Sequence, residues 1–316
     1  ARKYSTKHTS SLIFETKIVV LNISSIIAAF EAWITSMLTN NLRNIAIIAH
    51  VDHGKTTLVD KLLSQSGTLD RKTITSERLM DSNDQEKERG ITILAKNTAI
   101  NWQNFRINIV DTPGHADFGG EVERVLSMVD SVLLLVDAVD GPMPQTRFVT
   151  QKAFERGLCP IVVINKIDRP GARPNWAMDQ VFDLFDNLGA TDEQLDFSTV
   201  FTSAINGVAG LDCDEVADNM EPLFKTIVDQ VPPPKVDKTG PFQMQISALD
   251  YDSYTGVIGI GRISRGSAKP GMQVCVNNIH GENRRGKILS VKEYLGLDQF
   301  DTEVAHAGDI VCINGI

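Results

Sequence analysis

The sequence has few cysteines, no excess of positive charge and no long uninterrupted apolar run. Its four cysteines (Cys159, Cys213, Cys275 and Cys312) are scattered and include no C-x-x-C pair. This pattern favours reduced thiols in a cytoplasmic protein over a disulfide framework. The formal net charge is −9, so a nucleic-acid partner would have to be met by a local basic patch and not by the whole surface.

The first 36 residues fit poorly with the rest of the chain. They begin without methionine, and their apolar stretch, IVVLNISSIIAAF (18–30), is interrupted by asparagine and serine. That stretch is too short and too polar to span a bilayer, so no membrane partner is expected. Basic residues precede it, as in a signal or transit peptide, whereas Met37 lies directly before the first predicted strand and would be a natural start. The favoured interpretation is that residues 1–36 are a non-native or disordered extension.

From residue 44 to about residue 229, strand-like aliphatic runs alternate with helical patterns. Such alternation predicts an α/β domain with a mostly parallel sheet and helices on both faces. Ligands of such sheets bind at the carboxyl ends of the strands. The predicted strands are 45–49, 105–111, 131–138, 160–166 and 198–204, and the predicted helices are 55–66, 117–129, 144–157, 175–188 and 219–230.

The pattern changes after residue 230. VPPPKVDKTGP (231–241) contains three consecutive prolines, which cannot continue a helix and stiffen the chain, so it is interpreted as a linker. Residues 242–316 show short alternating runs punctuated by glycine, which predicts a small antiparallel β-barrel. The predicted organisation is therefore a domain at 37–230, a linker at 231–241 and a barrel at 242–316, which breaks off in mid-pattern.

The segment AHVDHGKTT (49–57) joins a predicted buried strand to an amphipathic helix. Backbone N–H groups at a helix start have no partners within the helix, and the helix dipole adds partial positive charge, so this turn is an anion site. Gly54 permits close approach of the backbone, Lys55 supplies a full charge and Thr56 supplies a hydroxyl for a metal ion. Ala49 stands where the phosphate-loop pattern usually has its first glycine.

Two further segments carry groups suited to magnesium and a γ-phosphate. DTPGH (111–115) follows a strand: Asp111 can hold magnesium through water, and the Gly114 N–H can reach the γ-phosphate. RGITI (89–93) offers Thr92 as a second hydroxyl for the metal ion.

NKID (165–168) also ends a strand and predicts guanine selectivity. Asp168 can accept hydrogen bonds from guanine N1–H and its exocyclic amine, donors that adenine does not offer there. Asn165 would tie this loop to the phosphate loop, and the stem of Lys166 would cover the base. In FTSAING (201–207), the backbone N–H groups of Ser203 and Ala204 are placed to meet the guanine carbonyl.

In this order and spacing, these motifs resemble the G domain of translational GTPases. The segments MDSNDQEKERGITI, DTPGHADFGGEVER, DAVDGPMPQTRFVTQKAF, NKIDRPGARP and GPFQMQISALDYDSYTGVIGIGRI resemble the TypA/BipA branch, over about 42–316. The resemblance implies a GTP hydrolase that uses Mg²⁺, with GTP as substrate and GDP as product. It implies that Lys55 neutralises the β- and γ-phosphates, that Thr56 and Thr92 ligate magnesium, and that His115 occupies the place of a water-orienting glutamine. The nucleotide-binding residues are expected to be Asp52, His53, Gly54, Lys55, Thr56, Thr57, Asn165, Lys166, Ile167, Asp168, Ser203 and Ala204, and the catalytic residues His115, Lys55 and Gly114.

The resemblance also implies a monomer that acts on the ribosome in translation or large-subunit assembly, with ribosomal RNA and tRNA as partners. Between Arg262 and Lys292 there are seven Lys or Arg residues and one acidic residue; this segment is either a solvated barrel face or an RNA contact. Two alternatives stay open: a translational GTPase of the elongation factor G or LepA kind, and a signalling switch of the Ras type. The predicted barrel argues against the second.

Overall fold

A computed structural model describes residues 39–68, 97–112, 119–253, 255–278 and 280–316. Residues 1–36, Thr92, Gly114 and His115 lie outside these ranges, so the expectations placed on them are not addressed by the structure. Within the described ranges, none of the helices combines the length and the apolar character that crossing a membrane requires.

The N-terminal part of the described chain (residues 39–230, the α/β part) is built on one sheet. Its strands are β1 (Leu42–Ala49), β2 (Asn97–Trp102), β3 (Phe105–Asp111), β4 (Ser131–Asp137), β5 (Pro160–Asn165), β6 (Ser198–Ser203) and β7 (Val208–Gly210). The sheet order is β2-β3-β1-β4-β5-β6-β7. Strands β3, β1, β4, β5 and β6 are parallel, and β2 and β7 pair antiparallel at the two edges. The predicted mostly parallel sheet is confirmed.

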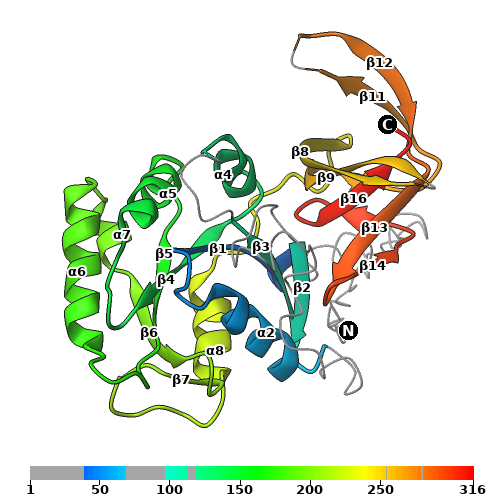
Figure 1. The fold of residues 1–316 in the computed structure, drawn as a ribbon. Helices are drawn as coiled ribbons and strands as arrows, with labels where there is room; N and C mark the ends of the chain where they lie inside the picture. The colour runs from blue at the N-terminus through cyan, green and yellow to red at the C-terminus, as the bar shows by residue number, and fades with distance from the viewer. Residues whose placement is uncertain (1–38, 69–96, 113–118, 254, 279) are drawn as a thin grey trace, which may run out of the picture.

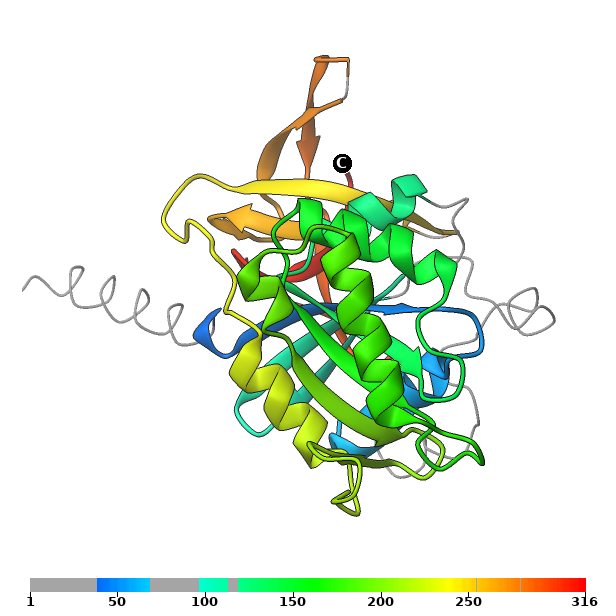
Figure 2. The same ribbon diagram turned by 90° about the vertical axis from the view of Figure 1, so that its left-hand side faces the viewer.

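Helices cover both faces of this sheet (Figure 1, Figure 2). Alternate residues of a strand point to opposite faces, so Ile45 and Ile47 of β1 pack with α2 and α8, whereas Ala46 and Ile48 pack with α4, α5 and α6. The helices are α2 (Lys55–Gln65), α4 (Gly119–Leu126), α5 (Pro144–Glu155), α6 (Pro174–Asn187), α7 (Asp192–Leu195) and α8 (Glu221–Gln230). The predicted helices agree with these except at their ends, while β2, β7 and α7 were not predicted.

The C-terminal part (residues 242–316, the β part) contains strands and no helix among its described residues. One sheet has the order β14-β13-β16-β9-β8, and β10–β15 and β11–β12 form two-stranded sheets; all pairings are antiparallel. All three sheets contribute to one apolar core that includes Ile263, Ala268, Val311 and the partly buried Val274. The antiparallel β architecture is confirmed. The bounds are β8 (Gln243–Asp252), β9 (Gly256–Arg265), β10 (Ser267–Ala268), β11 (Gln273–Asn277), β12 (Asn283–Lys287), β13 (Ser290–Leu295), β14 (Asp298–Asp301), β15 (Ala305–His306) and β16 (Ile310–Asn314).

The β part is attached to the edge of the parallel sheet formed by β2. The Gly296 N–H donates to the Ala99 carbonyl at 2.7 Å, and the Thr98 hydroxyl donates to the Gly296 carbonyl. On the neighbouring strand β3, Arg106 pairs with Glu293 and donates to the Tyr294 carbonyl at 2.9 Å. The unpaired side of an edge strand is thereby covered, which is one way to protect such an edge from pairing with other chains.

Candidate functional site at the carboxyl edge of the sheet

The loop after β1 leads directly into α2. Gly54 precedes the helix with φ 92° and ψ 26°, and within the described residues no side chain caps the helix start. A Cβ at Gly54 would lie 2.6 Å from Nδ2 of Asn165, a separation that real Cβ atoms do not show. Glycine is therefore required here by both conformation and space. The first-turn N–H groups of α2 have no partners within the helix and the helix dipole adds partial positive charge, so this helix start is suited to an anion.

Lys55, the first residue of α2, reaches across to the end of β3. Its Nζ lies 2.6 Å from Asp111 Oδ1 and donates to the Thr112 carbonyl at 2.7 Å. Both charged side chains are largely buried, with exposed fractions of 11% and 5%. The Thr112 hydroxyl in turn donates to the Ile47 carbonyl of β1 at 2.6 Å. The structure thus brings together the lysine and the carboxylate that the sequence predicted to share a site.

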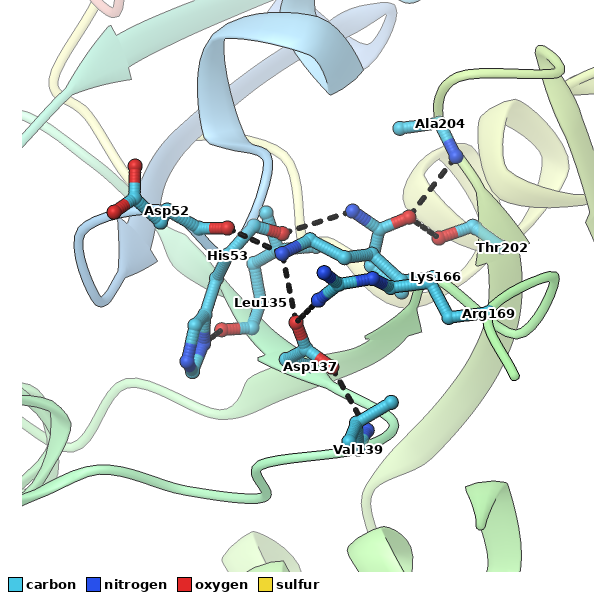
Figure 3. A network of polar contacts seen from close by, with 10 residues as sticks. Asp52, His53, Leu135, Asp137, Val139, Lys166, Arg169, Thr202 and Ala204 are labelled. Atoms are coloured by element: carbon cyan, nitrogen blue, oxygen red, sulfur yellow. Dashed lines mark hydrogen bonds and ion pairs between the residues drawn. The ribbon is translucent and has the colours of Figure 1, made fainter. Parts of the chain in front are cut away.

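Asn165, at the end of β5, connects three loops. Its Nδ2 donates to the His53 carbonyl at 2.9 Å. Its Oδ1 accepts from the Ala204 N–H at 2.9 Å and from the Thr202 hydroxyl at 3.1 Å. Figure 3 shows these contacts converging from the phosphate loop, β5 and β6. The predicted tie between the NKID loop and the phosphate loop is present, and it extends to the loop that follows β6.

Asp137, at the end of β4, is a member of this network that sequence analysis missed. It is fully buried and its Oδ2 lies 2.7 Å from Lys166 Nζ and 3.5 Å from Arg169. Lys166 also donates to the Asp52 carbonyl (Figure 3). Burial alone would raise the pKa of Asp137, but the hydrogen bonds and charge of Lys166 and the Val139 N–H outweigh it and hold that pKa below its ordinary value. Asp137 therefore stays ionised and fixes the Lys166 ammonium.

The backbone is unusual at both ends of the Lys166–Asp52 contact. Asp52 has φ 66° and Lys166 has φ 64°, and Gln103 is the remaining non-glycine residue with positive φ among those described. Left-handed backbone at non-glycine residues is costly and concentrates at functional sites. The nearby His53 ring is buried with Nδ1 3.3 Å from the Leu135 carbonyl, and burial lowers its pKa. A neutral ring is expected there.

The remaining predicted residues line the same edge. Asp168 is exposed beyond β5, next to the half-buried Ile167, and Ser203 and Ala204 are buried where β6 ends. On α2, Thr56 is half-buried and Thr57 is exposed. These residues lie at or just beyond the carboxyl ends of neighbouring parallel strands and therefore border one site. The site offers positive charge and backbone N–H groups for phosphates, and hydroxyl and carboxylate oxygens for a metal ion.

The family model for the elongation factor Tu GTP binding domain matches residues 40–233. The chain therefore belongs to this family of GTP-binding domains. It is 70% identical over 275 residues to the large ribosomal subunit assembly factor BipA of Escherichia coli strain K12, and 70% identical over 276 residues to the same factor of Haemophilus influenzae. Each match covers 87% of this chain and 45% of the relative, so the chain spans less than half the length of these relatives. The resemblance to the TypA/BipA branch is confirmed.

Solved structures agree with this placement. Translation elongation factor SelB of Methanococcus maripaludis, solved in complex with the GTP analogue GppNHp, superposes with a TM-score of 0.63 at 25% identity and covers 87% of this chain and 52% of its own. The bacterial selenocysteine-specific elongation factor EF-Sec gives a TM-score of 0.65 at 22% identity, covering 86% of this chain and 42% of its own. The second likeness shows the fold alone.

Proposed function

We propose that the chain binds GTP and GDP at the carboxyl edge of the parallel sheet and hydrolyses GTP. The observation that carries the proposal is the meeting of Lys55 and Asp111, 2.6 Å apart, beside the uncapped start of α2. Lys55 neutralises the β- and γ-phosphates, and the backbone from Asp52 to Thr57 surrounds them.

The guanine base is held by the loops that follow β5 and β6. Asp168 accepts from guanine N1–H and the exocyclic amine. The N–H groups of Ser203 and Ala204 meet the guanine carbonyl, and the Ala204 N–H, which donates to Asn165 Oδ1 at 2.9 Å, is shared between the two acceptors. The stem of Lys166 covers the base plane, because Asp137 and the Asp52 carbonyl fix its ammonium. Asn165 hydrogen-bonds to the His53 carbonyl of the phosphate loop and to the Ala204 N–H of the loop after β6, so it fixes the distance between these two loops.

Magnesium would be held by Thr56 and, through water, by Asp111, together with Thr92. The donor set fits this ion, since a hydroxyl and a carboxylate are hard oxygen ligands, and Asp111 already lies against the phosphate-binding lysine. When bound, magnesium neutralises charge that develops on the phosphates. Gly114 contributes its N–H to the γ-phosphate, and His115 orients the attacking water.

The partner proposed for the chain is the ribosome, because curated relatives that are 70% identical are named large ribosomal subunit assembly factors. Of the seven basic residues noted at 262–292, Arg262 and Arg265 form ion pairs with Asp130 and Asp237. The β11–β12 ribbon projects from the body (Figure 1, Figure 2) and carries the exposed basic residues Arg284, Arg285 and Lys287. We propose that these residues contact the phosphates of ribosomal RNA.

We retain the remaining expectations as part of the same proposal: a cytoplasmic monomer, tRNA as a further partner, and domains at 37–230 and 242–316 joined by a linker at 231–241. The partition is supported by the change from one mixed sheet to antiparallel sheets across residues 231–241. Residues 1–36 are proposed to have no role in this fold.

GTP hydrolysis and ribosome binding test the proposal together. The chain alone should turn over slowly, in the range of roughly 10⁻⁴ to 10⁻² per second found for GTPases without an activating partner. Purified ribosomes should raise that rate, and His115→Ala should bind GTP normally yet lose most of the stimulation. A rate that is equal with and without ribosomes, or equal stimulation of the variant, would contradict the ribosome-dependent mechanism. Failure to co-sediment with ribosomal subunits would contradict the ribosome as the partner of this chain.

A further inference from the structure

Gln65, the last residue of α2, lies outside every recognised motif and makes two side-chain contacts. Its Nε2 donates to the Gly207 carbonyl at 2.7 Å, and its Oε1 accepts from the Met220 N–H at 2.7 Å. Gly207 belongs to the loop after β6, and Met220 directly precedes α8. One side-chain amide on an exposed residue therefore joins the phosphate-loop helix to two separate segments on the base side of the site.

These contacts close a ring of interactions. One path leads from the His53 carbonyl through the Asn165 amide to the Ala204 N–H. From there, the Gly207 N–H donates to the Ser203 carbonyl at 2.8 Å, and the Gly207 carbonyl receives Gln65. Helix α2 leads back from Gln65 to Lys55, beside the phosphate loop where the path began. The loop that carries Ser203 and Ala204 is thus fixed from the phosphate loop at one end and from α2 at the other.

The far end of that loop fits closely against Gln65. Gly207 is buried and has φ 72°, and a Cβ placed on it would lie 2.8 Å from Nε2 of Gln65 and 3.4 Å from Cδ of Lys61. Between the two fixed ends, Ile205 and Asn206 are exposed to solvent. Asn165 therefore holds the Ala204 end. The Gly207 end is held by its own N–H bond to the Ser203 carbonyl and by the pairing of Val208 with Ser203, and its carbonyl is tied to α2 by Gln65.

We infer that Gln65 is a positioning residue for the loop of residues 203–207 (the base loop): it holds this loop against α2, so that the backbone of Ser203 and Ala204 keeps its place beside the guanine carbonyl. This inference rests on the proposed function. It adds a residue that supports binding of the base without contacting the base or the phosphates. Loss of the Gln65 amide removes the tie between the Gly207 carbonyl and α2, so the loop can shift relative to the helix and its contact with the base carbonyl weakens. The phosphate contacts of Lys55 stay in place.

The test compares three variants of the 316-residue chain. Gln65→Leu removes both hydrogen bonds at similar size. Gln65→Glu keeps an acceptor for the Met220 N–H but loses the donor to the Gly207 carbonyl. Ser64→Ala is the matched control on the same helical turn, because the Ser64 hydroxyl donates only within the helix, to the Lys61 carbonyl.

Affinity is measured by titration with GDP and with 2-aminopurine riboside diphosphate, which lacks the 6-carbonyl and the N1–H. Because the missing N1–H weakens the contact with Asp168 equally in every variant, each variant is compared with the wild type for the same nucleotide. Gln65→Leu and Gln65→Glu should lose about tenfold in GDP affinity, the scale of one or two hydrogen bonds, and less than about twofold for the analogue. Ser64→Ala should bind both as the wild type does. Equal losses for GDP and the analogue, or no loss, would overturn the inference while leaving the proposed function intact. A wild-type chain that binds no GDP would refute the proposed function itself.

Discussion

Lys55 Nζ and Asp111 Oδ1 lie 2.6 Å apart in a nearly buried ion pair that joins the start of α2 to the end of β3. Residues 69–96, which the structure does not describe, lie between the two residues in the sequence, yet the parallel pairing of β1 with β3 places them side by side. A phosphate-binding lysine that is held by a carboxylate is pre-oriented.

Lys55→Met should reduce both nucleotide affinity and stability. It removes the charge that faces the phosphates, and it leaves Asp111 buried without this cation. A lost hydrogen bond to a charged group costs about 1.5–3 kcal/mol, so GDP affinity should fall by roughly ten- to a hundredfold. Titration with fluorescent GDP and thermal unfolding measure the two effects. Lys225→Met, at an exposed position of α8, is the control, and an equal effect of both changes would argue against the phosphate assignment.

Asp168→Asn should change base selectivity. The amide replaces an acceptor by a group that also donates, which suits the extra carbonyl of xanthine and not the amine of guanine. Asp168 is exposed and lies outside the Asn165 network, so the fold should be unaffected. Competitive binding of GDP and xanthosine diphosphate measures the exchange in preference. Unchanged GDP affinity would count against the guanine assignment.

The motif residues were predictable from sequence because each ends or closely follows an aliphatic run, and the ends of parallel strands meet at one edge. In the structure, Lys55, Asp111 and Asn165 lie at that edge. The Asn165–Ala204 hydrogen bond was not predictable in the same way, since a spacing along the chain does not specify which amide a side chain contacts.

Asp137 and Gln65 were missed in the sequence for different reasons. Asp137 ends an aliphatic run and begins the segment DAVDGPMPQTRFVTQKAF, so a signal was present, but its role depends on Lys166, which follows the neighbouring strand β5. Gln65 is a polar residue at a helix end, where solvation is the ordinary expectation. Strand β2 was missed because its polar residues, among them Thr98, contact the β part instead of alternating with a buried face.

Arg262 and Arg265 allow a comparison of two Arg–Asp pairs on the same strand, β9. Arg262 pairs with Asp130 at 2.9 Å with exposed fractions of 14% and 12%, whereas Arg265 pairs with Asp237 at the same distance with fractions of 43% and 44%. Burial raises the pKa of Asp130 despite Arg262 and the Asn44 amide, so this carboxylate depends on its partners.

Arg262→Ala should therefore destabilise the protein by about 3 kcal/mol, because an uncompensated charge is left between the α/β part and the β part. Arg265→Ala should cost less than about 1 kcal/mol, as expected for an exposed pair. Urea unfolding measures both. Combining Arg262→Ala with Asp130→Asn should recover part of the loss, and equal costs for the two arginines would contradict the assignment of Arg262 as a buried contact between the two parts.

Asp309 links stability to pH. Its carboxylate accepts the His306 N–H at 2.8 Å, and burial raises its pKa to about 6, with Glu293 adding to the rise and the His306 N–H and Arg106 opposing it. An unfolded aspartate titrates near about 3.9. Between these two values the folded state binds more protons, so this group lowers the free energy of unfolding as the pH rises from about 4 through about 6, and the loss persists above.

Asp309→Asn keeps an oxygen acceptor for the His306 N–H and has no charge to bury. The variant should therefore be more stable than the wild type at about pH 8, and the difference should shrink towards zero at about pH 4, where both side chains are neutral. Urea unfolding at a series of pH values measures the difference. Asp298→Asn, at an exposed position of β14, should show no such trend. A difference between Asp309→Asn and the wild type that is constant across the series would mean that the substitution acts through packing and not through the charge.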